Sequence, residues 1–114
     1  MTAVTRLRGV LTLTLLTTAA LGQAYAQDAG AAVYATQKCS LCHSLGGRGN
    51  AKGPLDEVGS KLTTDEIRKW IVTPAEMTAK SSSKRKPAMR AYPNLPKAEL
   101  DALVAHMAAQ KKKK

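Results

Sequence analysis

The sequence predicts a small all-α protein. Two segments place apolar residues at helical spacing, the first with Ile67, Trp70 and Ile71 and the second with Leu100, Leu103, Val104 and Met107. The alternation of apolar and polar residues that marks a β-strand is not visible in the sequence, and neither is an internal repeat. A chain of 114 residues has room for one domain. We therefore expect three to four helices around a single core.

The two amphipathic segments have start and stop signals. Thr63 and Glu66 have the spacing of a capping box, which predicts that a helix begins there. This helix should end before Pro74, because a proline disfavours helical backbone in the residue before it. Pro96 can occupy the first turn of the last helix.

The remaining segments are a further helix and two loops. Residues 28–38 are rich in Ala and are expected to form a short helix with Asp28 as its N-cap. Residues 44–53 contain four glycines, too many for a regular element. Residues 74–95 contain three prolines and a run of serines, which predicts a long loop.

The first 26 residues have the features of a secretory signal peptide. Two arginines and no acidic residue precede an uncharged, largely apolar run over residues 10–21, and Ala24-Tyr25-Ala26 supplies small residues for signal peptidase. A membrane-spanning helix needs about 20 apolar residues, more than this run provides. We predict cleavage before Gln27, which leaves residues 27–114 as one exported domain without a membrane span, periplasmic in a bacterium.

Composition limits the partners and the core of this domain. Without the two arginines of the signal peptide, 16 basic residues stand against 8 acidic ones, a net charge of +8. This charge favours acidic proteins or anionic surfaces as partners, and export argues against nucleic acid. The chain contains no Phe and one Trp, so its own side chains make a thin core. Domains of this size usually depend on disulfides, a metal or a cofactor.

The candidate chemistry lies in Cys39-Ser40-Leu41-Cys42-His43. This spacing is typical of haem c attachment, because two thiols on one turn of backbone can bond both vinyl groups of a porphyrin while the adjacent imidazole binds the iron. A disulfide across so short a loop would stabilise the fold little. A zinc site would need two further ligands, whereas the only other Cys or His is His106, and a thioredoxin-type redox pair would need strands. Covalent haem at Cys39 and Cys42, with His43 on the iron, is the interpretation that we favour.

Residues 30–110 resemble the class I cytochrome c family, which carries one haem. The matching segments are Gly30 with Tyr34, the haem motif, Gly53-Pro54, Trp70 with Ile71 and Pro74, residues 89–95, and residues 103–107. The resemblance implies a small cytochrome c-like fold of three to four helices wrapped around one covalently bound haem c. The sequence departs from the family pattern in having Arg90 rather than Pro after the matching Met, and His106 where an aromatic is common.

The resemblance also implies roles for individual residues. The iron would have His43 and Met89 as axial ligands. Pro54 would belong to the Gly-Pro pair whose carbonyl accepts a hydrogen bond from the proximal imidazole. Trp70 would lie beside the haem propionates, and Tyr92 would support the haem pocket from the segment that follows Met89.

Two other residues are weaker candidates for the iron. Met77 follows the end of the second predicted helix and is expected to pack or to be exposed. His106 would give a haem with two His ligands, an alternative that we favour less, since a lone His on a helix is usually structural. Met107 continues the apolar stripe and is expected to be core.

Five basic residues surround the position of Met89 and are expected to dock the redox partner, namely Lys80, Lys84, Arg85, Lys86 and Arg90. Each alone could be an ordinary solvated charge, but as a cluster they would speed encounter with an acidic protein. The basic tail at 111–114 is expected to add only general attraction to anionic surfaces.

These features favour a soluble one-electron carrier with a His/Met haem, shuttling between respiratory or dehydrogenase partners. Contacts with acidic redox proteins would be transient and the protein a monomer. A dedicated electron-accepting subunit of one dehydrogenase is an alternative. A peroxidase-like haem enzyme with a displaceable Met is less favoured, because no acid or base is evident near the expected distal side.

Overall fold

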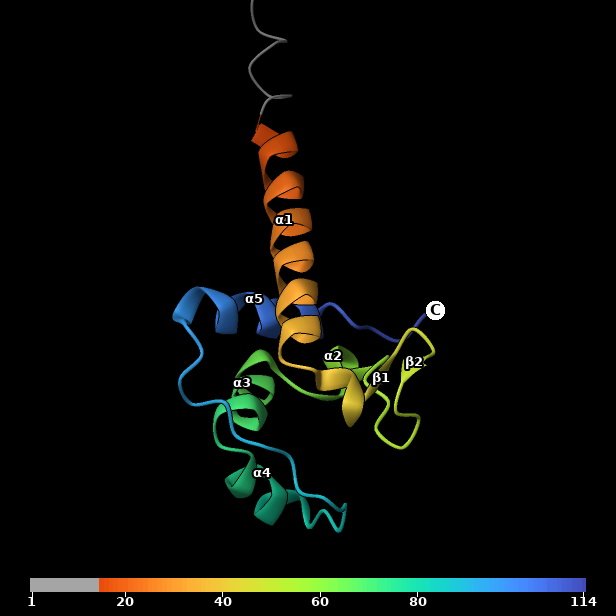
Figure 1. Cartoon of the computed structure of the whole chain (residues 1–114). Helices are drawn as coiled ribbons and strands as arrows, with labels where there is room; N and C mark the ends of the chain where they lie inside the picture. The colour runs from red at the N-terminus through yellow and green to blue at the C-terminus, as the bar shows by residue number, and fades with distance from the viewer. Residues whose placement is uncertain (1–14) are drawn as a thin grey trace, which may run out of the picture.

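The computed structural model describes residues 15–114. Within this part of the chain the fold consists of helices, one 3₁₀ turn and one very short hairpin (Figure 1). The elements are α1 (Leu15–Thr36), η1 (Cys39–Leu41), β1 (Ser44–Leu45), β2 (Arg48–Gly49), α2 (Val58–Lys61), α3 (Thr64–Val72), α4 (Pro74–Ser81) and α5 (Lys97–Ala108). The predicted all-α class is confirmed.

Helix α1 is longer than expected. In Figure 1 its N-terminal part extends away from the other elements, and only its C-terminal part lies against them. Asp28 lies inside this helix, so its predicted role as N-cap is wrong for the uncleaved chain, because helical residues precede it. The start of the predicted signal peptide, residues 1–14, lies outside the described residues, and cleavage before Gln27 stays a prediction. Among residues 15–114, no helix combines the length and the hydrophobicity that a membrane span requires.

The crossing of α1 and α5 is the largest contact between helices in the described chain. Gly30 lies at this crossing and is buried. A Cβ at Gly30 would lie closer than 3.0 Å to the carbonyl oxygen of Ala102 and to the Cβ of His106. The absence of a side chain at Gly30 therefore allows the two backbones to approach.

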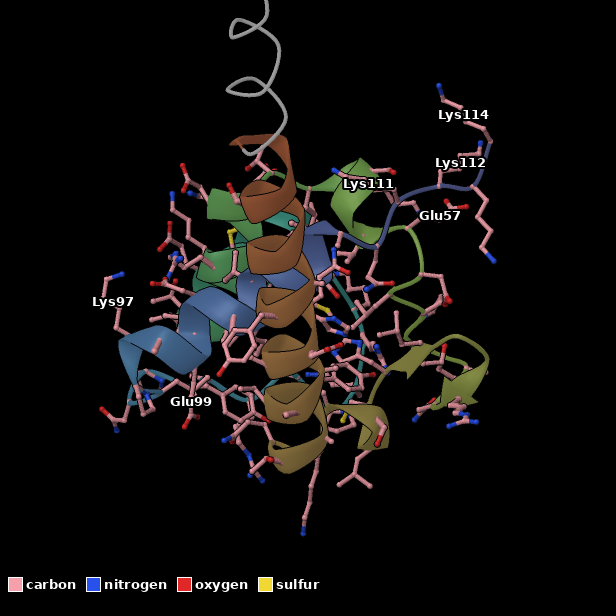
Figure 2. All side chains as sticks on the ribbon, turned by 90° about the horizontal axis from the view of Figure 1, so that it is seen from above. Glu57, Lys97, Glu99, Lys111, Lys112 and Lys114 are labelled. Carbon is pink, nitrogen blue, oxygen red and sulfur yellow. The ribbon has the colours of Figure 1, made fainter. Side chains whose placement is uncertain are left out.

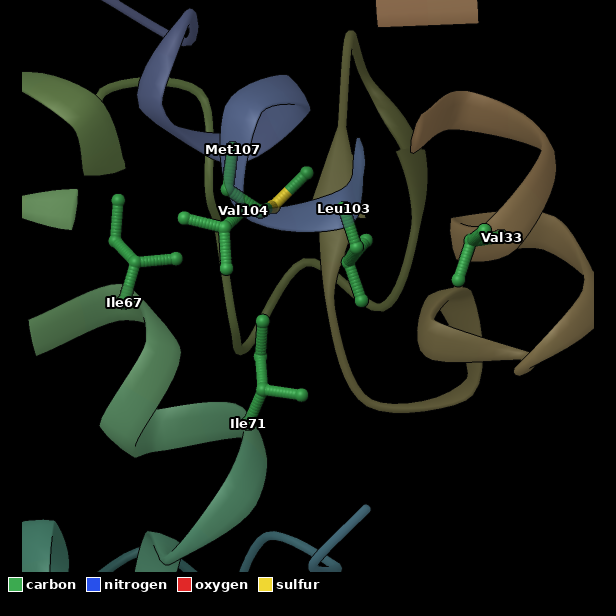
Figure 3. Packing of buried hydrophobic residues seen from close by; sticks show 6 residues of the cluster. All are labelled: Val33, Ile67, Ile71, Leu103, Val104 and Met107. Carbon is green, nitrogen blue, oxygen red and sulfur yellow. The ribbon is translucent and has the colours of Figure 1, made fainter. Parts of the chain in front are cut away.

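The core forms where α1, α3 and α5 meet. Its buried side chains are Val33 from α1, Ile67 and Ile71 from α3, and Leu103, Val104 and Met107 from α5. Figure 3 shows the side chains of α3 and α5 facing one another, with Val33 at the edge of this group. Each is buried, with at most 8% of its surface exposed. Both apolar stripes predicted from the sequence therefore face the same core.

Helix α3 begins as the sequence predicts. The Glu66 amide donates to Thr63 Oγ1 at 3.2 Å, and the Thr63 amide donates to Glu66 Oε2 at 2.8 Å, which completes the capping box. The helix ends at Val72, just before Pro74.

Helix α4 corrects the prediction of an uninterrupted loop over residues 74–95. Pro74 ends α3 but also begins α4, because its missing N–H costs nothing in the first turn of a helix. Lys80 and Glu76, one turn apart on α4, form an ion pair of 2.8 Å. Residues 82–96 then return without helix or strand to α5.

The Gly-rich segment after the cysteines contains β1 and β2, which were not predicted. Their register pairs Ser44 with Gly49. Gly46, Gly47 and Gly49 have positive φ values of 58°, 76° and 100°, so the reversal uses backbone conformations that favour glycine. Strands of two residues are too short to show alternation in a sequence.

Helix α2 was also not predicted, and it holds the start of the basic tail. The Gly59 amide donates to the carbonyl of Gln110 at 2.8 Å, and the Lys112 amide donates to Ser60 Oγ at 2.8 Å. In Figure 2, Lys111, Lys112 and Lys114 lie together on one side of the molecule, away from Lys97 at the start of α5. The tail is therefore attached to α2 at its beginning.

Candidate functional site

A cavity of about 290 Å³ lies between the turn that follows α1, the core helices and the segment after α4. Most of its lining is apolar, with Leu55, Val58, Leu62, Ile67, Ile71, Leu103 and Met107 among the contributors. The chemically active residues of the lining are Cys39, Cys42, His43 and Met89. The fold thus brings the C-x-x-C-H motif and Met89 to one cavity.

The cysteine turn forms directly after α1. Lys38 adopts left-handed backbone with φ of 56°, which reverses the chain, and η1 follows. The carbonyl of Cys39 accepts hydrogen bonds from the amides of Cys42 at 3.2 Å and His43 at 2.9 Å. Both thiols are free, that of Cys39 half-buried and that of Cys42 exposed. The turn therefore presents two thiols and one imidazole from five consecutive residues.

The imidazole of His43 is oriented by the backbone. Its Nδ1 lies 3.1 Å from the carbonyl oxygen of Gly53, which also accepts the Ser44 amide at 3.0 Å. Within the Gly53-Pro54 pair, the accepting carbonyl is thus that of Gly53 rather than that of Pro54. Pro54 instead forms an isolated parallel bridge with Ser44. With Nδ1 engaged, Nε2 is the nitrogen available to a ligand.

Burial lowers the pKa of His43 below its ordinary value of 6.5. The hydrogen bond to Gly53 opposes this effect, and the positive charge of Arg85 adds to it. The imidazole is consequently neutral at neutral pH, the form that binds a metal.

The three other candidates for the iron differ in position. Met89 lines the cavity and is half-buried, whereas Met77 is buried on α4 and does not line it. His106 does not line the cavity either, and its ring packs edge-on against Tyr34 with centroids 6.4 Å apart. Of these residues only Met89 shares the cavity with His43, which argues against the alternative with two His ligands.

The supporting residues divide into two groups. Trp70 lines the cavity from α3, and its place beside the haem propionates stays a prediction. Tyr92 does not line it, and instead its amide donates to the Ile71 carbonyl at 2.9 Å while its hydroxyl lies 3.4 Å from the Gln37 carbonyl. It therefore ties the segment after Met89 to α3 and to the end of α1, and its support is indirect.

Tyr34 has a place in the site that sequence reasoning did not assign. It lines the cavity, and its hydroxyl lies 3.5 Å from the carbonyl oxygen of His43. Burial raises the pKa of its hydroxyl, so Tyr34 keeps its proton at neutral pH. The scarcity of aromatic residues was the available signal, since Tyr34 is one of only two tyrosines within residues 27–114.

Four of the five basic residues predicted to dock a partner are exposed, and the fifth is half-buried. Lys80, Lys84, Lys86 and Arg90 are the exposed ones, and Lys80 forms an ion pair with Glu76. Arg85 is half-buried, lines the cavity and donates through Nη2 to the carbonyl of Cys42. Arg85 is therefore part of the cavity wall, and its place on a docking surface stays a prediction.

The donor set fits a haem. Two thiols and an imidazole contributed by one turn, a thioether contributed by another segment and an apolar lining are what a covalently held porphyrin requires. Within residues 15–114 no three His, Cys, Asp or Glu side chains come close enough to hold a metal ion by themselves.

Comparison with known families agrees with this chemistry. The family model for cytochrome c matches residues 27–111. The chain belongs to the cytochrome c family. Its cofactor is accordingly a covalently bound haem c with iron, and its fold is a small all-α cytochrome c fold. No curated protein and no solved structure is significantly similar to this chain.

Proposed function

We propose that this cytochrome c is a one-electron carrier in which Cys39 and Cys42 bind the haem and His43 and Met89 bind its iron. The observation that carries the proposal is the single cavity lined by all four residues. When bound there, the haem supplies a one-electron Fe(III)/Fe(II) couple. The family is typically one of electron carriers rather than enzymes.

The residues of the chain would each favour electron transfer in a particular way. The Gly53 carbonyl fixes the orientation of the His43 ring, and the attachment turn fixes its position. A thioether ligand from Met89 favours the ferrous state and raises the reduction potential. The apolar lining excludes water, so the charge on the iron can change with little rearrangement of solvent.

A pair of methionine variants tests the axial ligand. In Met89→Ala the ferric holoprotein should lose the charge-transfer band in the red that a sulfur–iron bond gives, and its midpoint potential should fall. Met77→Ala is the matched control, because Met77 is buried outside the cavity. It should keep the band and lose stability, by about 2–5 kcal/mol for a buried Met.

The same spectra separate the carrier from the alternatives. A wild-type ferric protein that is high-spin, with no sulfur–iron band, would contradict Met89 ligation and favour a haem enzyme with an open site. Loss of the band in Met77→Ala and its retention in Met89→Ala would reverse the assignment.

We further propose that an acidic redox protein docks transiently over the segment that carries Met89. Lys84, Lys86 and Arg90 support this proposal because they are exposed on that segment and have no ion-pair partner within residues 15–114. A carrier must also release its partner quickly, which suits a small interface held by long-range charge. The protein would act as a monomer in the periplasm after cleavage before Gln27.

Charge reversal tests this docking surface. Exposed charges are screened over about 8 Å at physiological ionic strength, so the bimolecular electron-transfer rate with the native partner should fall as salt rises. Replacement of Lys84, Lys86 and Arg90 by Glu should slow electron transfer strongly at low salt. Replacement of Lys111, Lys112 and Lys114 by Glu should slow it far less, because these tail lysines lie beside α2. A rate indifferent to the first triple variant would overturn the proposal.

A further inference from the structure

Arg85 differs from the basic residues on either side of it. Lys84 and Lys86 are exposed, whereas Arg85 is half-buried and lines the cavity. A long cationic side chain turns inward only where its donors find partners, since burying an unpaired charge is costly. The contacts of its guanidinium therefore indicate what the residue does.

The guanidinium contacts the attachment turn at two points. Its Nη2 donates to the carbonyl of Cys42. Its Nη1 and Cζ lie against Gly53, where a Cβ would come closer than 3.0 Å to both atoms. Gly53 is the residue whose carbonyl holds the Nδ1 of His43. Arg85 thus contacts both the residue before His43 and the residue that orients its ring.

Arg85 also belongs to the segment that carries the other axial candidate. Met89 lies four residues later and lines the same cavity. No other hydrogen bond between the described residues 82–91 and the attachment turn is found. The contact between Arg85 and Cys42 therefore links the two sides of the cavity directly.

The charge of Arg85 is not neutralised by a carboxylate within residues 15–114. A positive charge fixed in the wall of an apolar cavity opposes the more positive ferric state of an iron held there. It should therefore raise the reduction potential. An exposed lysine such as Lys84 would act much less, because solvent and salt screen it.

We propose that Arg85 is a positioning residue for the haem, which clamps the Met89 segment to the Cys42–His43 turn and raises the reduction potential through its half-buried positive charge. This inference rests on the proposed binding of haem by Cys39, Cys42, His43 and Met89. It assigns Arg85 a role in the site rather than in docking.

The test compares Arg85→Gln with Lys84→Gln in the holoprotein, since both variants remove one positive charge from adjacent positions. At a fixed solution potential, Arg85→Gln should raise the ratio of oxidised to reduced protein about threefold or more, whereas Lys84→Gln should change it less. Imidazole added to the ferric protein probes how readily Met89 leaves the iron. Its affinity should rise about tenfold in Arg85→Gln and little in Lys84→Gln, because only the first variant loses the clamp.

Arg85→Lys separates the charge from the clamp. Lysine keeps the charge but cannot reproduce the fork of the guanidinium, so the potential should stay close to that of the wild type while imidazole affinity rises. If Arg85→Gln does not fold, a raised imidazole affinity in Arg85→Lys supports the clamp and an unchanged one overturns it. Equal reduction potentials and equal imidazole affinities in Arg85→Gln and Lys84→Gln would also overturn the proposed role of Arg85. A wild-type protein without the sulfur–iron band would instead contradict the proposed function itself.

Discussion

Gly30→Ala should destabilise the fold at the crossing of α1 and α5. The added Cβ would lie closer than 3.0 Å to the Ala102 carbonyl oxygen and the His106 Cβ, and 2.9 Å from the Ala102 carbonyl carbon. None of these atoms is the end of a flexible side chain, so relief requires the two helices to separate. Separation would loosen the packing of Leu103 and Val104 in the core.

The magnitude follows from two opposing effects. Overpacking a well-packed contact costs about 1–3 kcal/mol, and the rigidity of the blocking atoms places this site at or above the upper end. Replacing Gly by Ala within a helix returns about 1 kcal/mol. The free energy of unfolding should therefore fall by about 2 kcal/mol, which lowers the melting temperature of a domain of this size by about 8–16 °C.

Thermal unfolding of the holoprotein, followed by far-ultraviolet circular dichroism and by haem absorbance, measures this loss. Ala31→Ser is the matched control, because Ala31 is the next residue of α1 and is exposed. It should change the stability by no more than about 0.5 kcal/mol. If Gly30→Ala melted at the temperature of the control, the close approach of α1 and α5 would be wrong.

Three further substitutions test other parts of the fold by chemical or thermal denaturation. Thr63→Ala removes the N-cap of α3 and should cost about 1 kcal/mol, and an unchanged stability would contradict the capping box. Burial lowers the pKa of His106 below 6.5, so as pH falls the unfolded chain binds a proton at His106 more readily than the folded chain does. The free energy of unfolding should therefore decline below about pH 6.5. His106→Phe should reduce this decline. An equal pH dependence in both proteins would refute the burial of His106. Arg68→Met breaks the ion pair of 2.7 Å with Asp101, and because both side chains are 39% exposed and screened by solvent, the free energy of unfolding should change little.

The helices with long apolar stripes could be predicted from the sequence. Ile67, Trp70 and Ile71 on α3, and Leu100, Leu103 and Met107 on α5, recur at the i, i+3, i+4 and i+7 spacing typical of a helix. The structure buries Ile67, Ile71, Leu103 and Met107 in the core. The elements that were not predicted are either short, as β1, β2 and α2 are, or begin at a proline that also ends the preceding helix, as α4 does. Pro74 was interpreted only as the end of one helix, although proline is equally suited to the first turn of another.

The residues of the candidate site that follow one another in the sequence could be predicted from their spacing. The residues that reach the site through tertiary contacts could not. The motif from Cys39 to His43 fixes three donors by sequence alone. Which carbonyl holds the imidazole depends on how residues 44–54 fold, and the structure selects Gly53 over Pro54. Arg85 resembles its basic neighbours in the sequence, and only its contacts with the Cys42 carbonyl and with Gly53 in the folded chain distinguish it.

The mass of the acid-denatured protein, made with the full cytochrome c maturation machinery, tests the central claim most directly. Thioether bonds survive denaturation in acid, so the haem should stay on the chain in the wild type. The mass should then equal that of the chain plus one haem, and digestion should place the haem on the peptide that contains Cys39 and Cys42. Recovery of haem-free chain from a correctly matured wild-type protein would contradict covalent attachment and with it the account of the site.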